Sequence, residues 1–210
     1  MKFTYLKQPP KRYTFEMPKL KKWIEQNCKG KVLNLFAGKV LLKVDETRND
    51  LDTSCPADYH MHADDILNFF IDRNIKFDTI IFDPPHAHSF KSIFFGIPDR
   101  ETWLKNHPED KRKYPSYYGM DIYKSHTQLL LAIHKAQNEF LRVLKDDGIL
   151  WFNWSEIIIR LERILVLFKD SWDEHIRLQI ASEHQTLSDC KNYWICLMKG
   201  NSPFKQTTIV

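Results

Sequence analysis

The sequence predicts an α/β fold in which a mostly parallel sheet carries helices on both faces. Short, mainly apolar runs occur at residues 32–36, 79–82 and 149–154, each directly preceded by a charged residue or a glycine. Such runs are typical of strands that are buried on both sides in a parallel sheet. Residues 125–144, between the last two runs, carry apolar side chains at helical spacing. Strands that alternate with helices in this way indicate one α/β sheet.

Length and composition favour one domain over residues 1–210. The chain is 43% hydrophobic, as expected for a protein with a sizeable core, and its net charge of +4 permits a nucleic-acid partner without requiring one. The four cysteines form no C-x-x-C pair, so no disulfide framework is expected. No apolar run is long enough to span a bilayer, and the N-terminus lacks a signal-peptide pattern. We therefore expect a cytoplasmic protein without a membrane partner; the sequence does not indicate its oligomeric state, and a monomer is compatible with it.

The first 30 residues are expected to form a basic arm followed by a helix. Residues 1–31 hold nine Lys or Arg against two acids, and three aromatic residues are interleaved with them: Tyr5, Tyr13 and Phe15. Cations that hold phosphates and rings that stack on bases suit a nucleic-acid surface, and a solvated basic arm is the alternative. Pro18 is typical of a first helical turn.

The segment DTIIFDPPH, residues 78–86, ends the buried strand at 79–82 with a stiff turn. Two successive prolines cannot donate hydrogen bonds to a neighbouring strand, and each restricts the residue before it. In open α/β sheets, ligands bind just beyond the carboxyl ends of strands. A carboxylate, a carbonyl and a flat ring are thus expected together at a ligand-binding edge.

This turn, Asp83-Pro84-Pro85-His86, resembles the Asp-Pro-Pro-Tyr signature of S-adenosylmethionine (SAM)-dependent amino-methyltransferases, which act on base amino groups in DNA or RNA. The resemblance implies that Asp83 and the carbonyl of Pro84 accept the two N–H groups of an exocyclic amine. His86 stands in the family's aromatic position and would stack on the base. For the motif alone, an ordinary strand exit remains the alternative.

The turn after the first buried strand also resembles this family. The string Asn34-Leu35-Phe36-Ala37-Gly38 is similar to its Asp-Pro-Phe-x-Gly motif, with Asn34 in the acidic position. Small residues in such a turn let a cofactor approach the backbone closely. The resemblance implies that Asn34, Phe36, Ala37 and Gly38 bind the methionine and ribose portion of SAM.

Two acidic positions complete the implied cofactor site. Only eleven residues separate Gly38 from Asp50, so we expect a very short helix or an extended crossover before a strand at 46–51. In the family, the acid at the end of this strand accepts hydrogen bonds from both ribose hydroxyls. We assign this role to Asp50, with Asp52 as the second choice.

A third strand is expected at residues 58–65. The family places an acid at its end that accepts from the adenine amino group, which points to Asp64, with Asp65 as the rival. The pair His60-x-His62 has spacing that suits a metal, but no carboxylate or cysteine cluster accompanies it, so no metal is expected.

Residues 87–124 form a connection too long for a simple loop. It carries many aromatic residues and the basic cluster Lys111-Arg112-Lys113. Directly after the Asp83 strand, it would act as a lid and a substrate-recognition loop. Packing of its aromatics into a small satellite core is the alternative.

A helix is expected at 155–168, and strands are expected at 175–183 and 192–198 as an antiparallel pair. This order resembles the Rossmann-like class I methyltransferase fold, whose seven-stranded sheet is mostly parallel with an antiparallel seventh strand between the fifth and sixth. FLRVLKDDGILWFNW also resembles the entrance to the fifth strand of this superfamily. The details are similar to small archaeal and phage DPPY/DPPH methyltransferases.

The resemblance implies a SAM-dependent N-methyltransferase that modifies cytosine N4 or adenine N6 in a nucleic acid. RNA, including ribosomal RNA, is favoured because one small domain offers little surface for reading a duplex site, whereas structured RNA is read by shape and unpaired bases. Three alternatives remain open. They are a DNA amino-methyltransferase, an enzyme of this fold acting on protein glutamine or a small amine, and a non-catalytic nucleic-acid-binding module.

Overall fold

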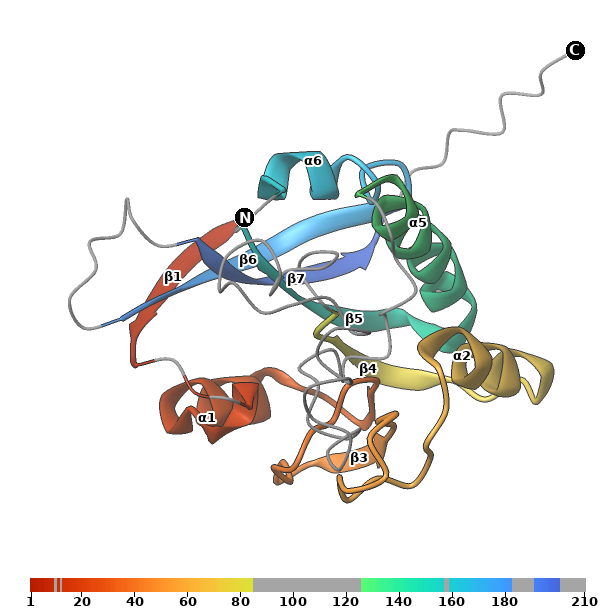
Figure 1. Cartoon of the computed structure of the whole chain (residues 1–210). Coiled ribbons are helices and arrows are strands. Elements are labelled where there is room, and N and C mark those ends of the chain that lie inside the picture. Colours follow the sequence, from red (N-terminus) through yellow and green to blue (C-terminus); the bar gives the residue numbers. More distant parts are fainter. Residues whose placement is uncertain (10, 12, 85–125, 157–158, 183–190, 201–210) are drawn as a thin grey trace, which may run out of the picture.

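The computed structural model describes residues 1–9, 11, 13–84, 126–156, 159–182 and 191–200 (Figure 1). Within these ranges seven strands form one sheet in the order β1-β6-β7-β5-β4-β2-β3. The strands are β1 (Lys2–Lys7), β2 (Lys31–Asn34), β3 (Asp45–Arg48), β4 (Phe77–Phe82), β5 (Leu144–Ser155), β6 (Trp172–Ala181) and β7 (Asn192–Lys199). β7 is antiparallel to both β5 and β6, and the other pairs are parallel, which confirms the predicted fold class.

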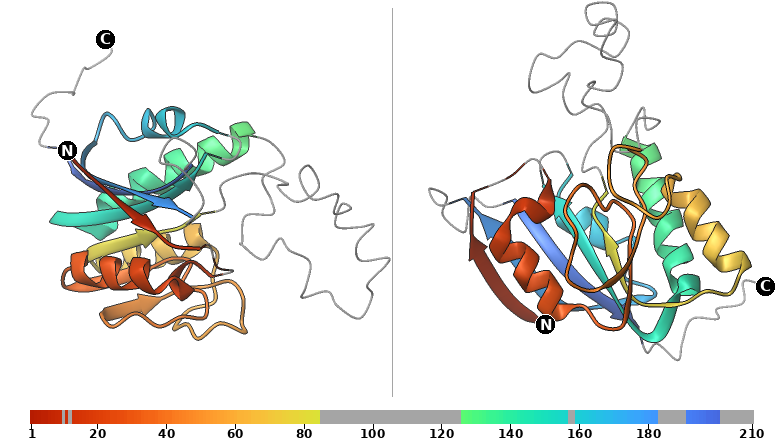
Figure 2. Two further views of the ribbon diagram at one scale, coloured as in Figure 1. Left: turned by 90° about the vertical axis from the view of Figure 1, so that its left-hand side faces the viewer. Right: turned by 90° about the horizontal axis from the view of Figure 1, so that it is seen from below.

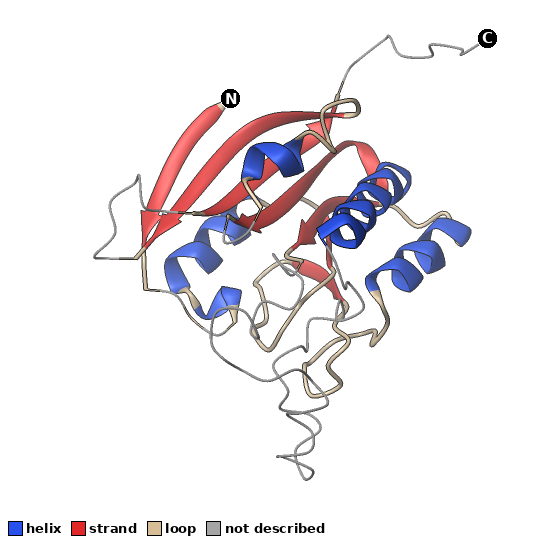
Figure 3. Cartoon of the chain, turned by 45° about the horizontal axis from the view of Figure 1, so that its top comes forward, coloured by secondary structure: helices blue, strands red, loops and turns tan. Residues whose placement is uncertain are grey.

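Helices lie on both faces of this sheet, as predicted (Figures 2 and 3). The described helical segments are η1 (Thr14–Glu16), α1 (Pro18–Asn27), α2 (Ala63–Asp72), α5 (His126–Val143) and α6 (Leu161–Leu165). None of the helices in the described ranges is long and apolar enough to cross a membrane.

The core is divided by the sheet into two layers because side chains alternate along each strand. In β4, Ile80 and Phe82 pack with α2, α5 and α6 on one face, while Ile81 packs with α1 and η1 on the other. β5 follows the same rule, with Phe152 in the first layer and Trp151 in the second. Buried apolar side chains fill both layers, and this packed core holds the carboxyl ends of β4 and β5 in place.

The connection from β2 to β3 contains no helix. The extended crossover that was one of the two expectations is therefore confirmed. The predicted long helices also form, since α5 covers the amphipathic segment and α1 begins with Pro18 in its first turn. The predicted helix at 155–168 is shorter, with α6 spanning five residues.

The prediction of a strand at 58–65 is wrong. These described residues form no strand, and their pairing is limited to a single bridge between Asn49 and Tyr59. Instead, the loop after β3 makes hydrogen bonds with the backbone at the end of β3. The carboxylate of Asp58 accepts from the backbone N–H of Arg48 at 2.8 Å, and the backbone of Asp58 donates to the carbonyl of Arg48 at 3.0 Å. A local side chain has thus replaced a ladder of strand hydrogen bonds.

The seventh strand instead comes from the segment expected as a basic arm. β1 pairs with β6 in parallel, Leu6 packs against the layer beneath α1, and Phe3 and Tyr5 remain exposed. Lys2 and Lys7 hid this strand in the sequence, although lysines are common on exposed sheet edges. With β1 included, all the described strands except β7 run in one direction, and their carboxyl ends lie at one edge of the sheet.

Candidate active site

Asp83 lies directly after β4 and is half-buried at the carboxyl edge of the sheet. The hydroxyl of Thr14 donates to its Oδ2 at 2.6 Å, and the amide of Asn153 donates to its Oδ1 at 2.6 Å. The first distance is typical of a hydroxyl that donates to a charged carboxylate. Thr14 and Asn153 stand 69 and 70 positions from Asp83 in the sequence, so three separate segments meet at this carboxylate.

Pro84 follows Asp83 as a buried residue. Pro85 and His86 lie outside the described residues, as does the predicted substrate-recognition loop at 87–124. The roles predicted for these positions therefore stay predictions.

The predicted cofactor turn lies between β2 and β3. Gly38 adopts a φ of 60°, the left-handed conformation that glycine tolerates best. Its N–H donates to Oδ2 of Asp50 at 2.8 Å, and the N–H of Asp52 donates to Oδ1 of Asp50 at 2.9 Å. The structure thus places Gly38 and Asp50 side by side, and their contact with a cofactor stays a prediction.

The carboxylate of Asp50 has the acceptor capacity that a ribose diol needs. A carboxylate offers about four acceptor positions, and the two backbone N–H groups use one on each oxygen. Asp50 is half-buried, so a ligand can still reach it. The carboxylate of Asp50 can therefore accept hydrogen bonds from both hydroxyls of a ribose.

Asp52, the second choice for the ribose, is engaged in its own turn. Its Oδ1 accepts from the N–H of Ser54 at 2.8 Å. Burial by itself would raise the pKa of Asp52, but the hydrogen bonds from Ser54 and the nearby charges of Lys39 and His60 bring that pKa below its usual value. Asp50 stays the first choice because it is the carboxylate that accepts from the N–H of Gly38 in the glycine turn, and the assignment of the ribose acid stays a prediction.

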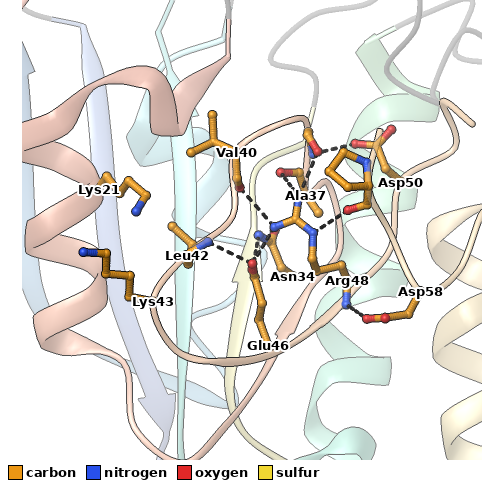
Figure 4. A network of polar contacts seen from close by, with 12 residues as sticks. Lys21, Asn34, Ala37, Val40, Leu42, Lys43, Glu46, Arg48, Asp50 and Asp58 are labelled. Atoms are coloured by element: carbon orange, nitrogen blue, oxygen red, sulfur yellow. Dashed lines mark hydrogen bonds and ion pairs between the residues drawn. The ribbon is translucent and has the colours of Figure 1, made fainter. Parts of the chain in front are cut away.

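Arg48 organises the whole turn, and the sequence did not single it out (Figure 4). Its side chain is 5% exposed and reaches between the glycine turn and the loop after β3. It donates to the carbonyls of Ala37 (3.2 Å), Gly38 (2.8 Å), Val40 (3.0 Å) and Pro56 (2.6 Å), and to Oε1 of Glu46 (2.5 Å). One planar guanidinium thus holds the carbonyls of the predicted cofactor turn in place.

Asn34 belongs to the same network and is fully buried beneath the turn. Its amide donates to Oε2 of Glu46 at 3.2 Å, while Glu46 Oε1 also accepts from the N–H of Leu42 at 2.9 Å. The Oδ1 atom of Asn34 has no hydrogen-bond partner in the described part of the chain. Asn34 supports the turn from below, and direct contact with a cofactor stays a prediction.

Two further predicted residues lie beside the turn. Ala37 is 2% exposed, and its N–H donates to the carbonyl of Asn49 at 3.0 Å. The ring of Phe36 lies 5.8 Å from that of Phe82, the last residue of β4. Phe36 therefore connects the glycine turn to the strand that presents Asp83.

Asp64 lies in the first turn of α2, and not at a strand end as predicted. The reason is the missing strand at 58–65, whose place is taken by a loop and the start of the helix. Lys135 on α5 donates to Oδ2 of Asp64 at 2.8 Å, and this hydrogen bond raises the pKa of Lys135. A helix-to-helix ion pair is thus what the structure shows for Asp64, and adenine binding stays a prediction. Asp65 also lies inside the helix, whose N-cap is His62.

The turn Tyr13–Glu16, just before α1, contacts both the glycine turn and Asp83. A Cβ atom on Gly38 would lie 3.3 Å from Cδ1 of Tyr13, so the ring packs closely on the glycine turn. Phe15 is 4% exposed and its ring lies 5.8 Å from that of Trp194 on β7. Thr14 therefore stands between Tyr13, which packs against the glycine turn, and Phe15, which is anchored in the core.

Sequence reasoning missed Thr14, Asn153 and Arg48. Asn153 carried a detectable signal, since it is the one polar residue in the apolar run at 149–154. Thr14 and Arg48 carried none, because their partners are set by the fold. Among the residues that the structure describes, no group of three or more His, Cys, Asp or Glu is placed to hold a metal ion.

No family model matches the sequence, and no curated protein matches it. Several solved structures share its architecture, and two of them are methyltransferases by their descriptions. One is a candidate methyltransferase in complex with S-adenosylhomocysteine (SAH), with a TM-score of 0.54 and 13% identity. The other is a candidate SAM-dependent methyltransferase from Streptococcus mutans, with a TM-score of 0.52 and 13% identity.

The chain has the class I methyltransferase fold. The alignments cover 87% of this chain and 48% of each of the two, so the chain spans about half the length of the structures it matches. In this fold, the glycine turn after β2, Asp50 after β3 and Asp83 after β4 lie at the edge where ligands bind in open α/β sheets.

Proposed function

We propose that this chain is a SAM-dependent methyltransferase that acts on an exocyclic amino group, cytosine N4 or adenine N6, of a nucleic acid. The observation that carries the proposal is the Asp83 carboxylate, fixed at the end of β4 by donors from Thr14 and Asn153. It is followed by two prolines, and the glycine turn with Asp50 lies on the neighbouring strands.

The residues around the glycine turn suit SAM. Asp50 has acceptor positions for two ribose hydroxyls, and Gly38 lets a ligand approach the backbone. The complex of one structural neighbour with SAH supports this choice of cofactor. When bound, SAM supplies an electrophilic methyl group.

The chain's own residues would prepare the amine. Asp83 accepts one N–H of the amino group, and the carbonyl of Pro84 accepts the other. Holding both N–H groups turns the nitrogen toward tetrahedral geometry and frees its lone pair from the base ring. Alignment and exclusion of water supply most of the rate gain, and the proton leaves through Asp83 or water.

RNA is the favoured substrate class. The basic N-terminal segment and the Lys111-Arg112-Lys113 cluster suit a polyanion. A duplex target would also require base flipping, whereas unpaired RNA bases are already accessible. A DNA amino-methyltransferase and a non-catalytic nucleic-acid-binding module are the alternatives.

Nucleoside mass spectrometry of RNA and DNA tests this proposal, using cells that express the wild-type chain, the Asp83→Asn variant or neither. We expect methylated cytidine or adenosine in RNA only with the wild-type chain. A methylated deoxynucleoside would favour the DNA alternative. No new nucleoside in either pool, with SAH binding intact, would favour a protein or small-amine substrate; no SAH binding would favour the binding module.

A further inference from the structure

The carboxylate of Asp83 is held from two sides by residues that no sequence motif connects. Thr14 reaches Oδ2 from η1, and Asn153 reaches Oδ1 from β5, each at 2.6 Å. The last torsion of an Asp side chain is broad and has no strong preference of its own. Two donors, one on each oxygen, therefore fix the plane of this carboxylate.

The orientation of the Asn153 amide follows from the same contact. Asn153 is 2% exposed, and its Oδ1 has no hydrogen-bond partner among the described residues. Rotating the amide by half a turn would place this oxygen against the carboxylate of Asp83, where two acceptors would repel each other. The geometry is thus held even though one buried acceptor is left unsatisfied, which costs free energy.

Thr14 is the more informative of the two residues because its segment also touches the cofactor turn. Tyr13 packs on Gly38, and Phe15 is anchored near Trp194. The turn is closed by its own hydrogen bonds, from the N–H of Glu16 to the carbonyl of Tyr13 at 3.0 Å and from the N–H of Tyr13 to the carboxylate of Glu16 at 3.3 Å. A β-branched residue between two anchored neighbours has little rotamer freedom.

We propose that Thr14 is a positioning residue for methyl transfer: its hydroxyl sets the plane of the Asp83 carboxylate, and the Tyr13–Glu16 turn ties that carboxylate to the glycine turn. The proposal rests on the proposed function, since it assigns Thr14 a part in presenting Asp83 to the substrate amine. Thr14 acts through Asp83 and is not itself assigned a contact with the substrate.

Three variants of the full chain separate positioning from general stability. Thr14→Val keeps the shape and removes the donor, and Thr14→Ser keeps the donor. Thr79→Val is the matched control in β4, because Thr79 is fully buried and its hydroxyl donates to the carbonyl of Lys29 at 2.8 Å, far along the strand from Asp83. Removing this hydroxyl should cost stability without loosening the carboxylate.

The first measurement needs no substrate. The side-chain NH₂ signals of Asn153 in ¹H–¹⁵N spectra report its hydrogen bond to Asp83. We expect Thr14→Val to shift or broaden these signals, because the carboxylate gains freedom, and we expect Thr14→Ser and Thr79→Val to leave them near their wild-type positions. Unchanged Asn153 signals in Thr14→Val would overturn the proposal.

The second measurement is methyl transfer to total RNA from cells that lack the chain, or to their DNA if the modified nucleoside is found in that pool. We expect Thr14→Val to lower kcat at least about tenfold with the KM for SAM within about threefold, because a loosely held group loses productive geometry. Thr14→Ser should recover most of the rate. Wild-type kcat in Thr14→Val, or an equal loss of kcat in Thr79→Val, would overturn the positioning role. If the wild-type chain methylates nothing, the proposed function fails, and the control of Asp83 by Thr14 is decided by the Asn153 signals.

Discussion

The two halves of the candidate site are built in different ways. The cofactor half, from Asn34 to Asp58, is local: Arg48, Glu46 and Asp50 make their hydrogen bonds within about one loop of sequence. The Asp83 half is assembled from an N-terminal turn, the end of β4 and the middle of the sheet. A local site can be disturbed by one loop change, whereas the Asp83 site depends on the whole sheet.

This difference predicts that substitutions in the two halves have separate consequences. Substitutions at Asp83 should stop the reaction and spare the cofactor. Substitutions around Asp50 should weaken the cofactor first. The following variants test that division, in order of decreasing expected effect.

Asp83→Asn is expected to have the largest effect. It keeps the shape but removes the charge, and it places an NH₂ donor where the amine needs an acceptor. Methyl transfer to the nucleic acid should fall by more than about 100-fold, which is the size of effect expected when a positioned acid–base group is lost. The check is a radiolabelled-methyl transfer assay, and substantial activity in this variant would move the catalytic role elsewhere.

Arg48→Met tests the cofactor half through stability. It leaves Glu46 buried without its ionic partner and four backbone carbonyls without their donor. Loss of one member of a buried ion pair costs about 3–5 kcal/mol of unfolding free energy, measurable by urea denaturation. Lys29→Met is the control, since the Lys29–Asp147 pair is 40% and 79% exposed and such pairs contribute about 0–1 kcal/mol. Equal losses in the two variants would show that Arg48 is not the organiser of the turn.

Asp50→Ala should weaken cofactor binding without abolishing the fold. A hydrogen bond to a charged group contributes about 1.5–3 kcal/mol, so the Kd for SAH should rise at least about tenfold. Asp52→Ala should stay within about twofold, because the N–H of Gly38 in the glycine turn donates to Asp50, whereas the carboxylate of Asp52 accepts from Ser54 in the following turn. If Asp52→Ala weakens binding and Asp50→Ala does not, the assignment of the ribose acid is wrong by two positions.

The triple change of Lys111, Arg112 and Lys113 to Ala should have the mildest effect on the reaction centre. It should weaken RNA binding several-fold and reduce the salt dependence of that binding, because fewer phosphate counterions are released. SAH affinity should not change. An unchanged salt slope would instead point to the basic N-terminal segment as the RNA contact.

Sequence reasoning was accurate where structure depends on local patterns. The buried strands around Ile81 and Trp151, the helix at 126–143, the antiparallel β7 and the extended crossover before β3 all follow from periodicity, spacing or resemblance. That Gly38 and Asp50 lie at the same edge of the sheet was also predictable, because they follow two neighbouring parallel strands, but the hydrogen bond between them was not predicted.

It failed where tertiary contacts override local patterns. Residues 58–65 alternate like a strand, but the carboxylate of Asp58 accepts from the backbone N–H of Arg48, and the pairing is limited to the bridge between Asn49 and Tyr59. Residues 2–7 were interpreted as part of a basic arm, because Lys2 and Lys7 obscure the sequence pattern of an edge strand. Thr14 has no local feature that points to Asp83, since the two are joined only when the sheet and the N-terminal turn are both in place.

The most direct test of the division between the two halves is calorimetric titration of SAH into Asp83→Asn and Asp50→Ala, beside the wild-type chain. We predict that the wild type binds SAH, that Asp83→Asn binds it within a few-fold of wild type, and that Asp50→Ala binds it at least about tenfold more weakly. Absence of binding by the wild type, or a larger loss in Asp83→Asn than in Asp50→Ala, would contradict the account.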